Sequence, residues 1–548
     1  MFSKLMRLYH TIKPLRFEQI YYRILYRLLP LRRVKCDVSA VTPATWVWSG
    51  PEVVERSIIC HDEVKFLSQQ VSISNRSVWN DSSHEKLWLY NLHYFDDLNA
   101  LDSLYRKDMQ YSLVRRWIAE NPPVSGNGWE PYPISLRLVN WTKWYNRAEI
   151  DDKHVIKSIG LQVKALSKQL EYHILGNHLF ANAKALVFSG CFLGSKDGDK
   201  YLRLGLELLD REIPEQFLDD GGHFELSPMY HSILLWDLLD LINLATISGG
   251  PLLKLRLPEW RAQAVKALEW LDVMTHGDGE ISFFNDATIG IAASPKDLKD
   301  YAVQLGLTSD YVNRFYRSLK NTGYSRINNS MYCLLFDHGA VGPSYLPGHA
   351  HADTLSFELS VGNHRFFVNS GTSLYGLSNE RHRQRGTAAH NTVVIDGADS
   401  SEVWGGFRVA KRANVSKYKV DLSVDAVVVS AQHDGYLRLK GGVIHTRVIS
   451  ASDNMISIHD RVTGSYKSAL SFYHLHPDIK VKEISDGRLE LTSIFGDTII
   501  FSSTGPIKIE STSYHPAFGV SISNKRLVVP LISDSLVIGI EIKKGLMS

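Results

Sequence analysis

The periodicity of the apolar residues changes near residue 325, and this change constrains the fold more than any other feature. Before it, apolar side chains recur at helical spacing over residues 155–176, 178–194, 200–218 and 260–276. After it, alternating segments such as MYCLLFD, TLSFELSV, GGVIHTRVIS and SLVIGIEIK are separated by Gly, Asn, Asp and Ser. The sequence therefore predicts helical hairpins followed by antiparallel sheets, rather than a βαβ arrangement.

The length of 548 residues predicts more than one hydrophobic core. We expect a basic, partly helical N-terminal extension over residues 1–80, a helical domain over 81–325 and a β-domain over 326–548. A net charge of +3 gives no reason to expect nucleic acid as a partner. The four cysteines show no CxxC spacing, which argues against a thiolate metal site.

Residues 1–35 have the pattern of a basic amphipathic helix, with arginines interleaved among isoleucine, leucine and tyrosine. The simpler interpretation is a helix packed on its own domain with its basic face in solvent. The alternative is contact with a membrane surface or an anionic glycan. No stretch approaches the ~20 apolar residues of a transmembrane helix, so no transmembrane segment is expected.

A first polar cluster lies in the segment WEPYPISLRLVNWTKWY, from Trp129 to Tyr145. On a helix that begins near Pro133, Arg137 and Asn140 lie within reach of each other. Aromatic rings beside one arginine are typical of sugar recognition, because rings stack on the sugar and a guanidinium binds a carboxylate or sulfate. The alternative is that these aromatic residues belong to the core.

Two further clusters lie in predicted helices. Asn177, His178 and Asn182 interrupt an apolar helix, where polar groups are costly unless they are bonded or line a cavity. In the segment DDGGHFELSPMYHS, a helix is expected to begin with Ser as its N-cap and Pro at its first position. Tyr230 and His231 would then lie in the first turn, where the helix dipole favours an ionised phenolate and a tyrosine could act as a base.

The fourth cluster begins with GHAHADTLSFEL, in which His349, His351 and Asp353 alternate and would share one face of an extended chain. Further along, the segment NERHRQRG is a basic loop whose charges either face solvent or bind an anionic substrate. His351 and His390 could supply two imidazoles to a metal ion from neighbouring strands.

Taken together, these motifs resemble the heparinase II/III-like polysaccharide lyases, the group that includes oligoalginate lyases. The resemblance runs from about residue 85 onward in the order NH, ExxPxYH, GHxHxDxxSFEL, xVNSGTxxYG and AHNTVxIDG. It implies an incomplete (α/α) toroid followed by an antiparallel β-sandwich. It also implies β-elimination on a uronate-containing acidic polysaccharide, in which a base removes the C5 proton and an acid protonates the departing C4 oxygen.

The resemblance also implies roles for individual residues. Asn177 and His178 correspond to the pair that neutralises the substrate carboxylate, and Tyr230 to the tyrosine that acts as base or acid. His349 corresponds to the histidine that completes the site from the sandwich. With the clusters above, the residues expected to contact substrate are Arg137, Trp129, Asn140, His231, Tyr375, Arg383 and Arg385.

Family members of this kind carry a structural zinc ion held by His, Asp and His, and the resemblance assigns its ligands to His351, Asn369 and His390. Asn369 departs from the family pattern, because a neutral amide binds a divalent cation less well than a carboxylate does. The chain also shows no cleavable signal peptide, which predicts a cytoplasmic or membrane-peripheral protein with the periplasm as the alternative that the family implies.

Two other functions stay open at this point. A uronate C5-epimerase would share the first proton abstraction, and a non-catalytic glycan-binding protein of polysaccharide biosynthesis would keep the groove without turnover. A hydrolase is less favoured, because hydrolases need paired carboxylates. Glu225 and Asp286 are the obvious clustered carboxylates, and they lie far apart in sequence.

Overall fold

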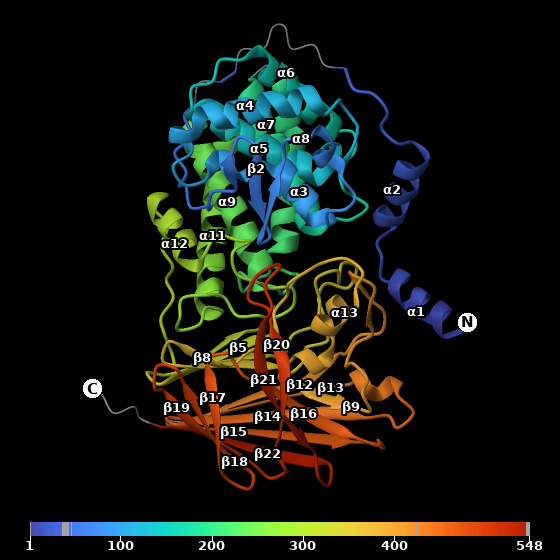
Figure 1. Cartoon of the computed structure of the whole chain (residues 1–548), viewed down its shortest axis with the longest axis vertical. Helices are drawn as coiled ribbons and strands as arrows, with labels where there is room; N and C mark the ends of the chain where they lie inside the picture. The colour runs from blue at the N-terminus through green and yellow to red at the C-terminus, as the bar shows by residue number, and fades with distance from the viewer. Residues whose placement is uncertain (1, 36–42, 45, 195, 424–425, 544–548) are drawn as a thin grey trace.

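The computed structural model divides the chain into a helical half and a strand-rich half, in the predicted order (Figure 1). It describes residues 2–35, 43–44, 46–194, 196–423 and 426–543. Helices from α3 (Lys86–Tyr94) to α12 (Pro295–Gln304) form the first half, and strands from β4 (Tyr316–Leu319) to β22 (Ser535–Ile542) form the second. The prediction of a helical region followed by antiparallel sheets is confirmed.

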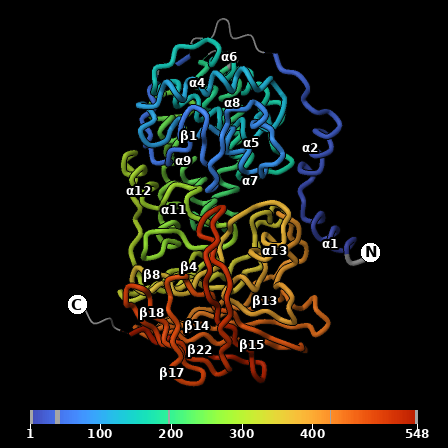
Figure 2. The backbone as a smooth tube through the Cα atoms, in the orientation of Figure 1, coloured from blue at the N-terminus to red at the C-terminus, as the bar shows by residue number. Residues whose placement is uncertain are grey.

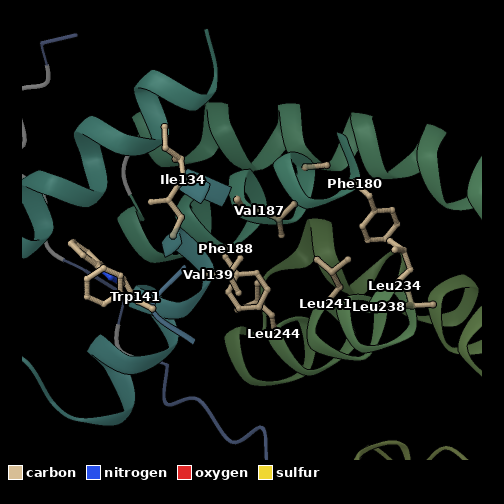
Figure 3. Packing of buried hydrophobic residues seen from close by; sticks show 14 of the residues in the cluster. Ile134, Val139, Trp141, Phe180, Val187, Phe188, Leu234, Leu238, Leu241 and Leu244 are labelled. Carbon is tan, nitrogen blue, oxygen red and sulfur yellow. The ribbon is translucent and has the colours of Figure 1, made fainter. Parts of the chain in front are cut away.

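The helical half consists of helices joined by short connections. After α3 they are α4 (Lys107–Glu120), α5 (Pro131–Arg147), α6 (Lys153–Leu166), α7 (Gly176–Leu193), α8 (Lys196–Gln216), α9 (Pro228–Ser248), α10 (Pro251–Lys254), α11 (Leu257–Val273) and α12. Helices α7 and α9 are buried on nearly every side, because apolar residues occupy all of their faces. Figure 3 shows Phe188 of α7 beside Leu241 and Leu244 of α9 in this core.

The segment predicted as one helix over residues 155–176 is broken in the structure. Helix α6 ends at Leu166, and the residues that follow form turns that lead into α7. Leu175 and Gly176 both have positive φ, and a Cβ on Gly176 would lie 2.3 Å from the Leu346 side chain. The apolar pattern continues through the break because Leu170 and Leu175 are buried as well, so periodicity alone could not locate the turn.

The strand-rich half contains three larger antiparallel sheets among its described residues. Their strand orders are β12-β13-β14-β15-β22-β19-β18-β17, β20-β21-β16-β9 and β4-β5-β6-β7-β8. The bounds of the other strands are β5 (Tyr324–Asn328), β6 (Tyr332–Asp337), β7 (Phe357–Val361), β8 (His364–Phe367), β9 (Val393–Ile395), β10 (Val403–Trp404), β11 (Arg408–Val409), β12 (Val415–Leu422), β13 (Ala426–His433), β14 (Ile444–Ser452), β15 (Met455–Thr463), β16 (Ala469–His474), β17 (Ile479–Ser485), β18 (Arg488–Ser493), β19 (Thr498–Ser503), β20 (Lys508–Tyr514) and β21 (Ile522–Pro530).

The five-stranded sheet joins the two halves, because β5, β6 and β7 are buried on both faces. Along β6, Leu334 and Phe336 pack into the core of the sandwich. Cys333 and Leu335, which alternate with them, pack with Trp270 of α11. A sheet that buries apolar side chains on both sides fixes the helical half against the sandwich.

A buried charge network crosses the eight-stranded sheet. Arg447 on β14 donates two hydrogen bonds to Asp460 on β15, at 2.7 and 2.8 Å, and His445 donates a third over 2.8 Å. The Arg447 guanidinium also donates to the carbonyls of Leu355 and Asn391. All three charged or polar side chains are fully buried, so the network connects the sheet to the segments around β7 and β9.

We expect Arg447→Met to lower the free energy of unfolding by about 3–5 kcal/mol, because it leaves the Asp460 carboxylate buried without its cation. The double variant Arg447→Met with Asp460→Leu removes both charges and should recover most of that loss. Urea unfolding of the three proteins measures both effects. A single variant as stable as the wild type, or a double variant as unstable as the single one, would contradict this role.

The described residues before α3 lie along the outside of both halves (Figure 2). They form α1 (Phe2–Ile12), α2 (Phe17–Leu28) and a small sheet of β1 (Ile58–Cys60), β2 (Glu63–Phe66) and β3 (Gln69–Ser72), which the sequence did not predict. One face of α2 packs on the protein, since Tyr22 stacks on Tyr172 with ring centroids 4.6 Å apart. The expectation of a helix packed on its own domain is therefore correct for this face.

Candidate active site

Polar side chains from both halves meet where the halves join. Tyr230 lies in the first turn of α9, and its hydroxyl is 3.0 Å from the hydroxyl of Tyr375. His349, from the loop between β6 and β7, lies against Tyr230 with ring centroids 4.0 Å apart. Asn177 Nδ2 donates to Glu225 Oε1 over 2.9 Å, and Glu225 Oε2 is 3.8 Å from His349 Nε2. The structure thus brings residues from four separate motifs into one site.

Helix starts orient the residues that the helical half contributes. Ser227 caps α9 by accepting a hydrogen bond from the Tyr230 backbone amide, and Pro228 occupies the first position, as predicted. Leu175 before α7 and Leu226 before this cap both have positive φ, which a leucine rarely adopts. Strained backbone at two helix starts that point to the same junction is typical of a functional site.

A buried carboxylate, Asp286, organises the strand-rich side of the site. It lies between α11 and α12 and accepts hydrogen bonds from His349 Nδ1 at 2.9 Å and from His351 Nε2 at 2.8 Å. The Arg381 guanidinium, fully buried, binds both of its oxygens. Burial alone would raise the pKa of Asp286, but Arg381 and the two histidines hold it well below its ordinary value. Asp286 is therefore a carboxylate that fixes two imidazoles.

The bond to Asp286 determines which nitrogen of His349 is free. Because Nδ1 donates to this carboxylate, the neutral ring carries its lone pair on Nε2, on the side of Glu225. Only 13% of the His349 side chain is exposed. A shielded imidazole with one nitrogen oriented by a carboxylate is suited to accept a proton at the other nitrogen.

The surroundings of the two tyrosines of the site favour the neutral phenol. Burial, reinforced by Tyr375 and Asp286, raises the pKa of Tyr230 well above its ordinary value, and burial does the same for Tyr375. Desolvation and nearby negative charge thus act against the stabilisation of a Tyr230 phenolate that the helix dipole was expected to give. Tyr230 begins as a proton donor.

His178 follows Asn177 in the first turn of α7. Its Nδ1 lies 2.9 Å from Glu171 Oε1, and its ring lies against Tyr132 with centroids 4.3 Å apart. Burial acts to lower the pKa of His178, but the Glu171 carboxylate outweighs it and raises the pKa. The side chain is 27% exposed, so His178 can present positive charge to an anionic ligand.

Asn182, the third polar residue of α7, has an internal role. It is fully buried and donates to Glu171 Oε2 and to Ser135, each within about 3 Å. Its carbonyl oxygen accepts from the Glu171 backbone amide at 2.8 Å. Asn182 therefore holds the glutamate that charges His178 and does not line the site.

The structure contradicts the expectation that Arg137 and Trp129 contact substrate. Arg137 is fully buried and donates to Gln162 and to the carbonyls of His93 and Gly128. Trp129 is 5% exposed and forms part of the hydrophobic core. The bonds to these backbone carbonyls and to Gln162 explain why a guanidinium can be buried here.

Asn140 and His231 are likewise structural residues. Asn140 donates to the Tyr94 carbonyl and to Asp96, and so links α5 to the end of α3. His231 is fully buried, donates to the Ala267 carbonyl at 3.0 Å and stacks on Trp270. Both use these polar atoms inside the helical half, so the structure does not bring them together with the residues of the site.

The predicted basic loop is the short helix α13 (Asn379–Arg385), and its arginines are committed to the protein. Arg381 binds Asp286, and the fully buried Arg385 donates to the carbonyls of Ala350 and Gly406. Arg383 is partly exposed and pairs with Glu380. This segment is therefore not a loop with its charges in solvent. It is also not a set of arginines that are free to bind an anion.

The three residues expected to bind zinc lie together behind the site. His390 Nδ1 is 3.1 Å from Asn369 Oδ1, and the rings of His351 and His390 have centroids 5.2 Å apart. His351 Nδ1, His390 Nε2 and Asn369 Nδ2 are buried and have no hydrogen-bond partner among the described residues. In the part of the chain that the structure describes, no group of three or more His, Cys, Asp or Glu side chains is arranged to hold a metal ion.

These unpartnered ring nitrogens fit a zinc ion. Two imidazoles that bind one zinc tetrahedrally, with Zn–N of about 2.0–2.1 Å, have ring centroids about 5 Å apart. The bond from His351 Nε2 to Asp286 leaves Nδ1 as its free lone pair, the carboxylate–histidine arrangement common behind metal sites. Asn369 would be a neutral third ligand only after its Oδ1 left the hydrogen bond with His390 Nδ1.

Asp353, the third alternating residue of the GHAHAD motif, does not join either histidine in a three-ligand strand. Its Oδ2 accepts a hydrogen bond from the Asn285 backbone amide at 3.1 Å. Burial raises the pKa of Asp353 and, together with the charge of Asp353, that of Asp337. Asp353 therefore supports the loop that positions Asp286.

The fold and this junction define a two-domain class known from solved lyase structures. The structure aligns with a crystal structure of heparinase III at a TM-score of 0.71 and 15% identity, over 96% of this chain and 89% of that one. It aligns with a mutant heparan sulfate lyase from Pedobacter heparinus at 0.61 and 17% identity, over 97% and 88%. The predicted (α/α) toroid followed by a β-sandwich is confirmed.

Two family models match consecutive parts of the chain: "Heparinase II/III N-terminus" over residues 82–326 and "Heparinase II/III-like, C-terminal" over 313–535. The chain belongs to the heparinase II/III family. A heparin-sulfate lyase from Bacteroides stercoris is 23% identical over 368 residues, which cover 62% of this chain and 50% of the relative. One from Bacteroides thetaiotaomicron is 23% identical over 336 residues, or 52% and 47%. The chain thus spans about half the length of these curated relatives.

Sequence reasoning missed the site roles of Glu225, Asp286 and Glu171. Glu225 and Asp286 were set aside because they lie far apart in sequence, yet they lie beside the two nitrogens of one imidazole, His349. Glu225 and Asp286 each lie next to a turn. A turn can be predicted from the sequence, but the sequence does not show which other loop it contacts in the fold. A buried cationic partner such as Arg381 is visible only in the fold.

Because Arg137 is structural, we expect Arg137→Met to destabilise the protein while leaving substrate affinity unchanged. Removing its three hydrogen bonds leaves the Gly128 and His93 carbonyls buried without donors, which costs about 1–3 kcal/mol each. Thermal unfolding and glycan binding measure the two effects. A variant of normal stability that binds glycan at least about tenfold more weakly would show that Arg137 contributes to substrate binding.

Proposed function

We propose that the protein is a polysaccharide lyase that cleaves a uronate-containing acidic polysaccharide by β-elimination. The observation that carries this proposal is the placement of His349 Nε2, a proton acceptor, against Tyr230, a neutral phenol. Acceptor and donor side by side match a reaction that removes one proton and delivers another. The printed names of the relatives, heparin-sulfate lyases, point to the same reaction class.

In the proposed reaction, His349 Nε2 takes the proton from C5 of the uronate. The electron pair of that C–H bond forms the C4=C5 double bond as the bond from C4 to its glycosidic oxygen breaks. Tyr230 gives its proton to the departing oxygen, and Tyr375 is within hydrogen-bond distance to stabilise the phenolate that remains. The products are a 4,5-unsaturated uronate and a free hydroxyl on the other fragment.

The C5 proton is acidic enough only when the neighbouring carboxylate is neutralised, because the developing enolate carries its negative charge there. We assign this to the Asn177 amide and to His178, whose pKa Glu171 raises. Recognition of the acidic polysaccharide then rests on these two residues rather than on Arg381 or Arg385, which are buried.

Glu225 completes the proposed proton acceptor. Once protonated, His349 is an imidazolium between Asp286 at Nδ1 and Glu225 at Nε2. The Oε2 atom of Glu225 is buried and has no hydrogen-bond partner among the described residues. A carboxylate at this distance stabilises the imidazolium electrostatically. Glu225 and Asp286 do not form a carboxylate pair for hydrolysis, since Asp286 is enclosed by Arg381 and two histidines.

Incubation with a panel of uronate polymers should raise ultraviolet absorbance as conjugated C4=C5 bonds form. Tyr230→Phe and His349→Ala should each lower this rate by at least about a hundredfold, since each removes a proton-transfer group. Tyr105→Phe, at an exposed position, is the matched control and should act like the wild type.

Exchange of the C5 proton for solvent deuterium at constant polymer length would contradict the lyase and identify an epimerase. Wild type and Tyr230→Phe with identical absorbance traces would contradict the role of Tyr230. Glycan binding without turnover on any polymer would leave a binding protein as the function.

We also propose that His351 and His390, with Asn369 as a neutral ligand, bind a zinc ion that supports the site without taking part in the reaction. The unpartnered ring nitrogens support this. When bound, the ion would hold the loops of the two histidines together. Through Asp286, which bonds both His351 and His349, it would also stabilise the orientation of the base.

Metal analysis of the purified protein should find about one zinc per chain, and chelation should lower the unfolding temperature. Asn369→Asp should bind zinc more tightly, because it adds a negative charge among neutral ligands. Unfolding temperature against zinc concentration compares the two proteins. No zinc in either protein, with unchanged unfolding temperatures, would show that hydrogen bonds alone hold this cluster.

A further inference from the structure

The two N-terminal helices expose their apolar faces to solvent. In α1 the exposed residues Leu5, Leu8, Tyr9 and Ile12 recur at the spacing of a single helix face. In α2 the same spacing joins the exposed residues Phe17, Ile20, Tyr21, Ile24 and Leu28, of which Phe17 is 80% exposed. A complete apolar stripe on each of two consecutive helices is unusual for a surface in water. We call these nine residues the N-terminal apolar stripes.

The face of α2 opposite its apolar stripe packs on the protein. The stripe itself therefore does not form the contact between α2 and its own domain. Gln19 is buried and donates to the carbonyls of Ile174 and Tyr345. Tyr22 stacks on Tyr172, and Tyr26 donates to the Leu170 carbonyl at 2.8 Å. The face of α2 that contacts the protein thus carries Gln19, Tyr22 and Tyr26, and the face with the apolar stripe points outward, the reverse of a helix that covers a core.

The charge around the stripes is strongly positive. Residues 1–35 contain nine lysines and arginines and one acidic residue, Glu18. Arg27 lies beside the stripe of α2 at helical spacing, and Lys4 lies beside the stripe of α1, whereas Arg7 is on the opposite face of α1. Arg23 donates to the His173 carbonyl of the protein. Apolar stripes flanked by cations are the pattern of helices that lie in the interface of an anionic bilayer.

We propose that α1 and α2 bind the protein peripherally to the surface of an anionic lipid bilayer through the N-terminal apolar stripes. The apolar side chains would enter the level of the acyl chains while the arginines contact lipid phosphates. Within the described part of the chain, no helix has both the length and the apolar character to cross a bilayer. Contact would therefore lie in the plane of the surface.

This placement would bring the proposed active site close to the bilayer. Gln19 contacts Ile174, three residues before Asn177, and Tyr345, four residues before His349. Figure 1 shows both helices beside the junction of the two halves. Because one helix touches both segments that lead into the site, the groove would work on glycan near the membrane.

Co-sedimentation of the full chain with lipid vesicles tests the proposal, and it needs no activity. Vesicles of phosphatidylcholine with phosphatidylglycerol should bind the protein, vesicles of phosphatidylcholine alone should bind it far more weakly, and added salt should reduce binding. The double variants Phe17→Asp/Ile24→Asp and Leu5→Asp/Ile12→Asp should each lower the bound fraction at least about tenfold. Leu255→Asp, which changes a leucine that is 77% exposed elsewhere, is the control and should bind normally.

Equal binding to both kinds of vesicle, binding that survives both double variants, or no binding would overturn the proposal. A second copy of the chain is the competing occupant of the stripes. A dimer in solution that both double variants convert to monomer, without any binding to anionic vesicles, would also overturn it. Circular dichroism of each variant shows whether a loss of binding comes from the surface or from unfolding.

Discussion

A single buried carboxylate, Asp286, is the interaction on which the rest of the site depends. It comes from the helical half and binds His349, His351 and Arg381 of the strand-rich half. A buried carboxylate without its cation is costly, so this cluster is stable only when the two halves are docked. The five-stranded sheet, buried on both faces, provides that docking. The site therefore depends on the fold, because Asp286 orients His349 only when the two halves are in contact.

The same carboxylate gives the GHAHAD motif two functions. Asp286 accepts from Nδ1 of His349 and from Nε2 of His351, so the free lone pairs of the two rings lie on different nitrogens. In our account, His349 serves the chemistry and His351 serves an internal cluster with His390. Alternation along an extended strand would have placed both on one face, but the chain in this segment is a loop. Because the segment is a loop, His349 and His351 can each donate to Asp286 from a different direction.

Local features could be predicted from the sequence, and partners distant in sequence could not. The order of helices and strands and the Ser227 cap depend on periodicity and capping, which are local. The convergence of Tyr230 with residues of the sandwich followed from the order of motifs and not from their spacing. Arg137 and Arg385 looked like groove residues because arginine usually lies at the surface. Their burial depends on backbone carbonyls, which only the fold brings to them.

The central claim is that bond cleavage occurs by elimination with His349 and Tyr230 as the proton-transfer groups. Cleavage of a uronate polymer in ¹⁸O-labelled water, read by mass spectrometry of the fragments, tests it directly. Elimination takes no oxygen from water into the new ends, so the account predicts fragments without ¹⁸O and one fragment carrying the unsaturated uronate. One ¹⁸O per cleaved bond, with saturated ends, would mean hydrolysis and would contradict the account.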